Sequence, residues 1–355
     1  MPNASLCVTD IGHRPKRETE ALMKTSLVKY ENAAETEVIG HDDRTQTAID
    51  FARKHQVFLA AATSDNTRRA YRSAIRHFLA WGGTLPSNER AIIAYLLAYA
   101  QSLNPRTLAL RLTALAQWHT SQGFTDPTAT VMVRKTLAGM MRIHGRPQKK
   151  AKALLLEDMK HIIAHLAQLN TLNAKRDNAL LQIAYFGAFR RSEVVRLEIE
   201  HITWEKAGLV ITLPRSKTDQ TGQGITKAIP LGEGLYCPTT ALRTWLTAAG
   251  LSSGALFRPI TRWGKIGTQF LHEASVNTIL TNCAKMIQLD YLPQLSSHSL
   301  RRGLATSAYR AGARFQDIKR QGGWRHNGTV QGDIEEAGQF EDNAAASLLR
   351  NKKIR

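Results

Sequence analysis

The spacing of apolar residues changes along the chain, and this change most constrains its fold. Between about residues 46 and 145 apolar side chains recur every three or four positions, which is typical of helices that bury one face. From Ile202 the spacing becomes that of strands, over residues 202–204, 209–213 and 227–231. The chain is therefore predicted to be mainly α-helical, with a small antiparallel β-sheet in its second half.

A short basic segment divides these two regions. Residues 146–152 (Arg-Pro-Gln-Lys-Lys-Ala-Lys) contain a proline and no apolar anchor, which is typical of an exposed linker. It separates a helical domain, residues 46–145, from a mixed α/β domain, residues 153–355. Residues 1–45 are polar without a sustained period and are predicted to be a disordered arm. The end of the second domain, residues 341–355, is predicted to be a C-terminal tail.

The charge balance points to a polyanionic partner. Lysine and arginine number 48 against 29 aspartate and glutamate residues, so the net charge is +19. Charge alone would suit DNA, RNA or an anionic membrane surface. The helical domain carries arginines on faces that its apolar residues leave free, and each is either a contact to the DNA backbone or a solvated surface charge. These candidates are Arg68, Arg69, Arg72, Arg106 and Arg111.

Several classes of protein are disfavoured by the sequence. It has no apolar run of about 18 residues that would span a membrane, and its N-terminus does not resemble a secretory signal. Its three cysteines are scattered without metal-ligand spacing. We expect a protein of the reducing cytoplasm, without a membrane association or a structural metal.

Basic residues occur at three places suited to binding an anion. His298 and Arg301 lie three apart in the predicted first turn of a helix, beside backbone N–H groups without helical partners. Arg190 precedes a helix start that also contains Glu193, and Lys217 begins a glycine-containing hairpin loop. Each feature alone also fits a solvated surface. Together they suggest a site for a phosphodiester.

The order of these motifs resembles the tyrosine recombinase family, also called phage-integrase-type site-specific recombinases. The motifs are Arg190 with Glu193, Lys217 on a hairpin, His298 with Arg301, and Gly322-Gly323-Trp324. The resemblance implies a helical, SAM-like core-binding domain and a mixed catalytic domain that form a C-shaped clamp on a double-stranded DNA recombination site. It also implies a homotetramer that joins two sites through a Holliday junction without a cofactor. Accessory DNA-bending proteins are further partners that it allows, and the DNA-bound protein would be associated with the nucleoid.

The resemblance also implies a role for each motif. Arg190 and Arg301 would neutralise the non-bridging oxygens as charge builds on the phosphorus. Lys217 would protonate the leaving 5′-oxygen, and His298 would assist proton transfer at the nucleophile. Trp324 replaces a histidine found in most members; its N–H can donate to the phosphate but cannot act as an acid or base. Glu193 would orient the basic residues.

The position of the nucleophile departs from the family pattern. The attacking tyrosine is expected about nine residues after Trp324, and Asp333 occupies that position. No tyrosine follows Tyr309, which lies on the helix predicted for His298. An aspartate would give a readily hydrolysed acyl phosphate, so this chain is predicted to bind and pair its DNA sites without cutting them. A non-catalytic DNA-binding or architectural protein is the alternative; a type IB topoisomerase-like enzyme is a third reading, but it also needs the tyrosine.

Overall fold

The fold is known from a computed structural model, which describes residues 51, 53–55, 57–58, 62–147, 149–214 and 224–334. The chain forms two compact units, which divide after Pro147. The predicted arm at residues 1–45, Lys217 and the tail at residues 341–355 lie outside the described residues. The described part is mainly helical with one three-stranded antiparallel sheet, which confirms the predicted fold class.

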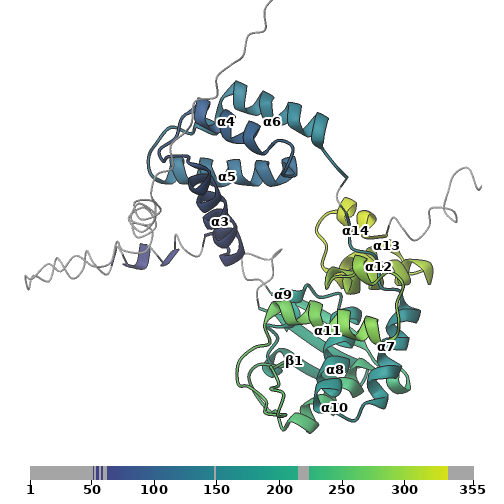
Figure 1. Cartoon of the computed structure of the whole chain (residues 1–355). Helices are drawn as coiled ribbons and strands as arrows, with labels where there is room; N and C mark the ends of the chain where they lie inside the picture. The colour runs from purple at the N-terminus through teal and green to yellow at the C-terminus, as the bar shows by residue number, and fades with distance from the viewer. Residues whose placement is uncertain are drawn as a thin grey trace, which may run out of the picture. The chain divides into compact units, whose positions relative to one another are not determined.

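The first unit is a small helical bundle (Figure 1). Its elements are α3 (Asp65–Trp81), α4 (Glu89–Tyr99), α5 (Pro105–Ser121), the short η1 (Pro127–Ala129) and α6 (Val131–His144). α5 packs against α3 and α6, and α4 packs against α6. Their apolar faces enclose a core that includes Phe78, Ile92, Tyr95, Leu108 and Leu115.

Local sequence signals set the ends of these helices. Side chains of Ser64, Asn88 and Asn104 each accept a backbone N–H in the first turn of α3, α4 and α5 respectively. Pro105, which has no N–H to lose, begins α5. Gly82 ends α3 with a φ of 106°, a left-handed conformation that favours glycine.

The second unit contains the sheet and the remaining helices. Its helices are α7 (Leu156–Gln168), α8 (Leu172–Phe186), α9 (Arg191–Val194), α10 (Pro238–Ala249), α11 (Glu273–Met286), α12 (His298–Arg310), α13 (Phe315–Gly322) and α14 (Asn327–Ile334). Short 3-10 turns are η2 (Ile199–His201), η3 (Gly234–Tyr236) and η4 (Leu292–Gln294). None of the helices in the described ranges is long and apolar enough to cross a membrane.

The sheet has the order β1-β2-β3, formed by β1 (Ile202–Glu205), β2 (Gly208–Leu213) and β3 (Ile225–Pro230). In its register Leu209 lies opposite Ile229 and Ile211 lies opposite Lys227. The inner face joins the main core around α8, whose residues 179–185 are all buried. Because α8 is enclosed, the chain that leaves it after Phe186 emerges at a fixed place.

A second, smaller core packs α12, α13 and α14 against the turn that follows α8. Its buried members are Ala188, Ala305, Ile318, Trp324, Val330 and Ile334. α12, α13 and α14 pack on one another to form it, and they lie together at the yellow end of the colours in Figure 1. This cluster brings residues near 190, 301, 324 and 333 into one region.

Candidate active site

Arg190 is held by a carboxylate one helical turn away. It is the N-cap residue of α9, and Glu193 accepts its backbone N–H at 2.9 Å and its Nη1 at 2.5 Å. The Glu193 side chain is 6% exposed, whereas the Arg190 side chain is 25% exposed. Glu193 therefore holds the guanidinium on its buried side, and the Arg190 side chain still reaches the surface.

Arg301 lies deeper in the same region. It is 2% exposed on α12, and its Nη1 donates to the carbonyl oxygens of Ala188 at 2.5 Å and Gly322 at 2.7 Å. Burial, together with the charge of Arg190, lowers the pKa of Arg301 to about 10, while Glu193 and Asp333 act in the opposite direction. Within the described part of the chain, Nη2 of Arg301 has no hydrogen-bond partner. A buried donor of this kind is costly unless an acceptor reaches it.

The indole of Trp324 covers Arg301. The guanidinium carbon lies 4.0 Å from the ring centroid, a cation–π contact. Residue 322 has to be a glycine for the indole to lie here, because a Cβ would lie 1.7 Å from an atom of the ring. The indole N–H donates to Oδ2 of Asp333 at 3.2 Å.

Asp333 lies against these basic residues although it is only 6% exposed. Its Oδ1 is 3.4 Å from Nε2 of His298 and 3.5 Å from Nε of Arg302. With the Trp324 N–H on the other oxygen, the carboxylate has positive or polar hydrogen-bonding groups around it. α14 thus points residue 333 into the basic cluster.

His298 and Arg302 complete the surroundings of Asp333. His298 begins α12, where the Ser296 side chain accepts its backbone N–H at 3.2 Å, and its own side chain is 52% exposed. Arg302 is 1% exposed and donates to the carbonyls of Ala151 and Gly332. Arg302 was not predicted from the sequence, because a second arginine after Arg301 on a helix start suggests no particular contact.

Lys227 is a second residue of this region that was not predicted from the sequence. The lysine is 3% exposed on β3, and its ammonium faces backbone carbonyls at the end of α8 and the end of α13. Burial, together with the charge of Arg301, lowers the pKa of Lys227 to about 7, against the opposing effect of Glu193. The signal was the alternation of β3, which puts Lys227 on the same inward face as Ile229.

The arginines predicted to contact DNA occupy α3 and α5 of the first unit. Arg69, Arg72 and Arg106 are exposed, whereas Arg68 and Arg111 are half-buried. Arg68 pairs with an aspartate one turn away. Nη1 of Arg111 donates to the Tyr95 hydroxyl at 3.1 Å, so this guanidinium also ties α5 to α4.

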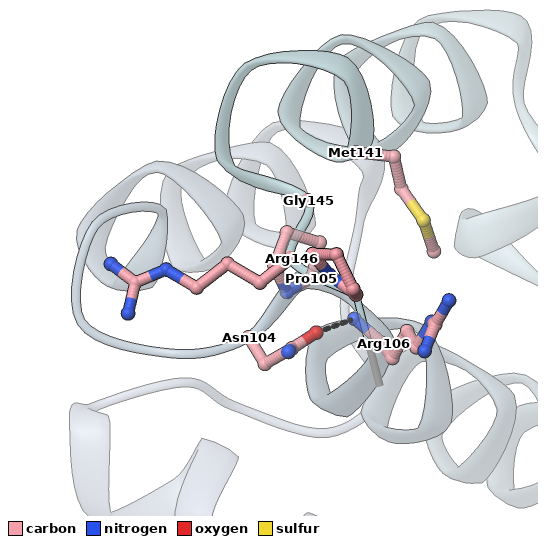
Figure 2. Close-up of a pocket in the computed structure, with 7 residues that line it drawn as sticks. Asn104, Pro105, Arg106, Met141, Gly145 and Arg146 are labelled. Atoms are coloured by element: carbon pink, nitrogen blue, oxygen red, sulfur yellow. Dashed lines mark hydrogen bonds between the residues drawn. The ribbon is translucent and has the colours of Figure 1, made fainter. Parts of the chain in front are cut away.

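A pocket of about 270 Å³ lies at the start of α5 (Figure 2). The Asn104 side chain accepts the backbone N–H of Arg106 there, at 2.9 Å. Figure 2 shows the side chains of Arg106 and Arg146 extending in opposite directions from the pocket. Because the two charges diverge, this pocket does not focus them on a shared anion. Among the described residues no three histidine, cysteine, aspartate or glutamate side chains gather to hold a metal ion.

Comparison with known proteins assigns the chain to a family. Residues 152–332 match the phage integrase family. The chain is 33% identical over 295 residues to the integrase/recombinase xerD homolog of Selenomonas ruminantium, an alignment that covers 81% of this chain and 86% of the relative. The chain therefore belongs to the phage integrase family, whose members are site-specific DNA recombinases of the tyrosine type.

Solved structures share the fold. A lambda integrase dimer bound to a COC′ core site matches with a TM-score of 0.55 at 13% identity, covering 91% of this chain and 88% of that chain. The Tn1549 transposon integrase in complex with transposon right end DNA matches with a TM-score of 0.55 at 15% identity, covering 84% and 97%. At these identities the likeness supports the fold, and the roles of individual residues need their own evidence.

Proposed function

We propose that this chain binds a double-stranded DNA recombination site and grips one backbone phosphate, but does not cut the strand. Arg190 and Arg301 are the groups that hold the phosphate, and the N–H of Trp324 joins them when it leaves Oδ2 of Asp333. The observation that carries the proposal is Asp333, a carboxylate among these groups at the position where the family has its tyrosine. Binding and chemistry are therefore separable in this protein.

The proposed contacts follow from chemistry and position. Guanidinium groups suit the non-bridging phosphate oxygens, and Nη2 of Arg301 is a buried donor in need of an acceptor. Arg190 reaches the surface while it is paired with the buried Glu193. This pair limits the conformations of the Arg190 side chain before DNA binds. Lys217, which lies between β2 and β3 in the sequence, is the proposed acid for the leaving 5′-oxygen.

A tyrosine at residue 333 would complete the reaction. Its oxygen would attack the phosphorus and pass its proton toward His298, while the bond to the 5′-oxygen breaks and that oxygen takes a proton from Lys217. The product would be a 3′-phosphotyrosyl bond and a free 5′-hydroxyl. Asp333 replaces this nucleophile with a charge that repels the phosphate, and its acyl phosphate would be hydrolysed by water.

The proposed assembly follows from family membership. Four copies would join two DNA sites, and with a competent nucleophile strand exchange would pass through a Holliday junction. The lambda and Tn1549 integrase structures are complexes with DNA, which supports DNA as the ligand here. The arginines of α3 and α5 are the proposed backbone contacts of the first unit, and accessory DNA-bending proteins would act on the same sites.

Restoring the nucleophile tests this function directly. The probes are duplexes that tile the DNA beside the gene for this chain, including nicked suicide substrates that trap a covalent adduct. The unaltered protein should bind a duplex without forming an adduct, and the Asp333→Tyr variant should form one. Asp333→Phe is the matched control, because it supplies the ring without the hydroxyl. An adduct with the unaltered protein would show that residue 333 is not the nucleophile position.

Salt dependence separates DNA binding from incidental basic charge. If the protein makes roughly eight phosphate contacts, its affinity should fall by orders of magnitude between about 50 and about 200 mM salt. Affinity that does not change with salt, or no binding to any duplex, would refute the proposal.

A non-catalytic DNA-binding or architectural protein is the second candidate, and Asp333 favours it. In such a protein the groups that serve cleavage need not remain competent. Failure of Asp333→Tyr to form an adduct on a duplex that it binds tightly would support this candidate.

A further inference from the structure

Lys227 makes an unusual set of contacts for a lysine on a strand. Its Nζ lies 2.6 Å from the carbonyl oxygen of Gly187 and 3.4 Å from that of Ala188. The same nitrogen lies 3.0 Å from the carbonyl of Gln321 and 3.3 Å from that of Gly322. An ammonium has three protons, so it can satisfy up to three of these four acceptors at a time.

The four carbonyls belong to two segments that are far apart in sequence. One is the turn that leaves α8, two residues before Arg190. The other is the end of α13, two residues before Trp324. Lys227 on β3 therefore connects the segments that present two of the proposed phosphate-binding groups.

Arg301 connects the same two segments from α12. Its Nη1 donates to Ala188 and Gly322, which are also acceptors for Lys227. Two basic groups thus share one set of carbonyl oxygens, and Glu193 is a carboxylate whose charge acts on both of them. Burying a second cation here is costly, and an apolar side chain would fill the same place at lower cost. Stability of the sheet alone does not account for a lysine at this position.

Further contacts reinforce this junction. The side-chain amide of Gln321 donates to the carbonyl of Phe186 at 2.8 Å and to that of Ala228, next to Lys227, at 3.0 Å. Ala188 has a φ of 46°, a left-handed conformation that is strained for a residue with a side chain. The bonds from Lys227 and Arg301 to the carbonyl of Ala188 hold this strained turn in place.

We propose that Lys227 is a positioning residue of the phosphate-binding site, which joins the turn before Arg190 to the turn before Trp324 beneath Arg301. Its nitrogen faces carbonyl oxygens and does not reach DNA, so it is distinct from the proposed acid Lys217. The inference rests on the proposed function in one respect only, namely that Arg190 and Trp324, which follow the two turns, bind a phosphate. The junction itself is testable without DNA.

The first experiment measures amide hydrogen exchange in the protein without DNA. Lys227→Met keeps the shape of the side chain and removes its donors and charge. At about pH 6 Lys227 is mostly protonated, because its pKa is about 7. Since hydrogen bonds from a charged donor are stronger than neutral ones, exchange at that pH should become at least about tenfold faster at residues 187–190 and also at 321–325. Strands β1 and β2 should keep their protection. Lys227→Arg, which retains charge and donors, should restore protection partly in both segments.

Ile229→Ala is the matched control, since Ile229 lies on the same inward face of β3 and is 1% exposed. It should destabilise the unit without selectively opening the two turns. If Ile229→Ala opens them as Lys227→Met does, or if only one turn responds to Lys227→Met, the inference is wrong. Should Lys227→Met not fold, Lys227→Gln decides, because its shorter neutral side chain cannot reach carbonyls in both turns: faster exchange confined to the two turns supports the junction, and unaltered exchange there overturns it.

The second experiment adds Lys227→Met to Asp333→Tyr and measures single-turnover cleavage at saturating DNA. Displacement of catalytic groups by about 1 Å can cost about 100-fold in rate, so the cleavage rate should fall strongly while the Kd for DNA stays the same. A raised Kd with an unchanged rate would contradict a positioning role. If Asp333→Tyr alone does not cleave, the proposed function fails, while hydrogen exchange still judges the role of Lys227.

Discussion

Removing the charge of Asp333 should strengthen DNA binding, and the structure sets the size of the effect. Oδ1 of Asp333 is 3.4 Å from Nε2 of His298. A phosphate oxygen that accepts a hydrogen bond from the same imidazole at about 2.9 Å would place the two negative charges about 6 Å apart. At that distance their repulsion is about 3 kcal/mol at an effective dielectric constant near 20, and about 0.7 kcal/mol in bulk water.

Asp333→Asn is the change that tests this repulsion. The amide oxygen can still accept the N–H of Trp324, so the shape of the site is largely kept. Because Arg302 lies 3.5 Å away and already offsets part of the charge, we expect a gain in the middle of the range, about tenfold in Kd. Fluorescence anisotropy with a labelled duplex measures it, and thermal unfolding shows whether the loss of the Arg302 pair weakens the fold.

Glu233→Gln is the control for net charge. Glu233 is exposed in the turn after β3, and the substitution changes the total charge by the same amount. The gain should be specific to Asp333→Asn, and it should persist at about 150 mM salt because charges about 6 Å apart lie within the Debye length of about 8 Å. Equal gains in the two variants, or no gain in either, would refute the placement of the phosphate beside Asp333.

Three further predictions concern the stability of the units. Burial lowers the pKa of Lys227 to about 7, so above that pH the unfolded chain binds more protons than the folded one. The free energy of unfolding should therefore rise by about 2 kcal/mol from pH 7 to 9 relative to Lys227→Met, as measured by urea unfolding. Gly322→Ala should cost about 1–3 kcal/mol and shift the fluorescence of Trp324, because the new Cβ would overlap the indole ring. His119→Leu should destabilise the first unit by about 1–3 kcal/mol in thermal unfolding, because the backbone N–H of Ser87 loses its acceptor; an unchanged melting temperature would contradict this.

The period of apolar residues was enough to predict a mainly helical fold with a small antiparallel sheet, because most elements bury one face, but it did not predict α13 or α14. The third strand was predicted for residues 227–231, whereas β3 is Ile225–Pro230. Its first residue is only partly buried, so the apolar pattern marks its start weakly. The residues predicted for the site were those that the family motifs make visible. The structure brings Arg190, Arg301, Trp324 and Asp333 into one cluster.

The residues behind the site were not predicted. Lys227 and Arg302 donate to backbone carbonyls. Every residue has a carbonyl, so the sequence does not show which carbonyl will accept a given side chain. The alternation of buried and exposed residues along β3 could have shown that Lys227 faces inward. For Arg302 no comparable signal exists, since its partners lie at residues 151 and 332 and depend on how α14 packs.

Substitution of the two arginines of the proposed site would therefore have different structural consequences. Arg190 is partly exposed and has Glu193 as its partner, so its loss mainly removes a phosphate contact. Arg301 also bonds the turns that precede Arg190 and Trp324, so its loss would displace both neighbours as well as remove a charge. A larger effect of Arg301 on cleavage would thus not by itself rank the two as contributors to the reaction. The contribution of Arg301 to charge stabilisation can be judged only after its structural contribution is known, and exchange at the shared turns provides that measure.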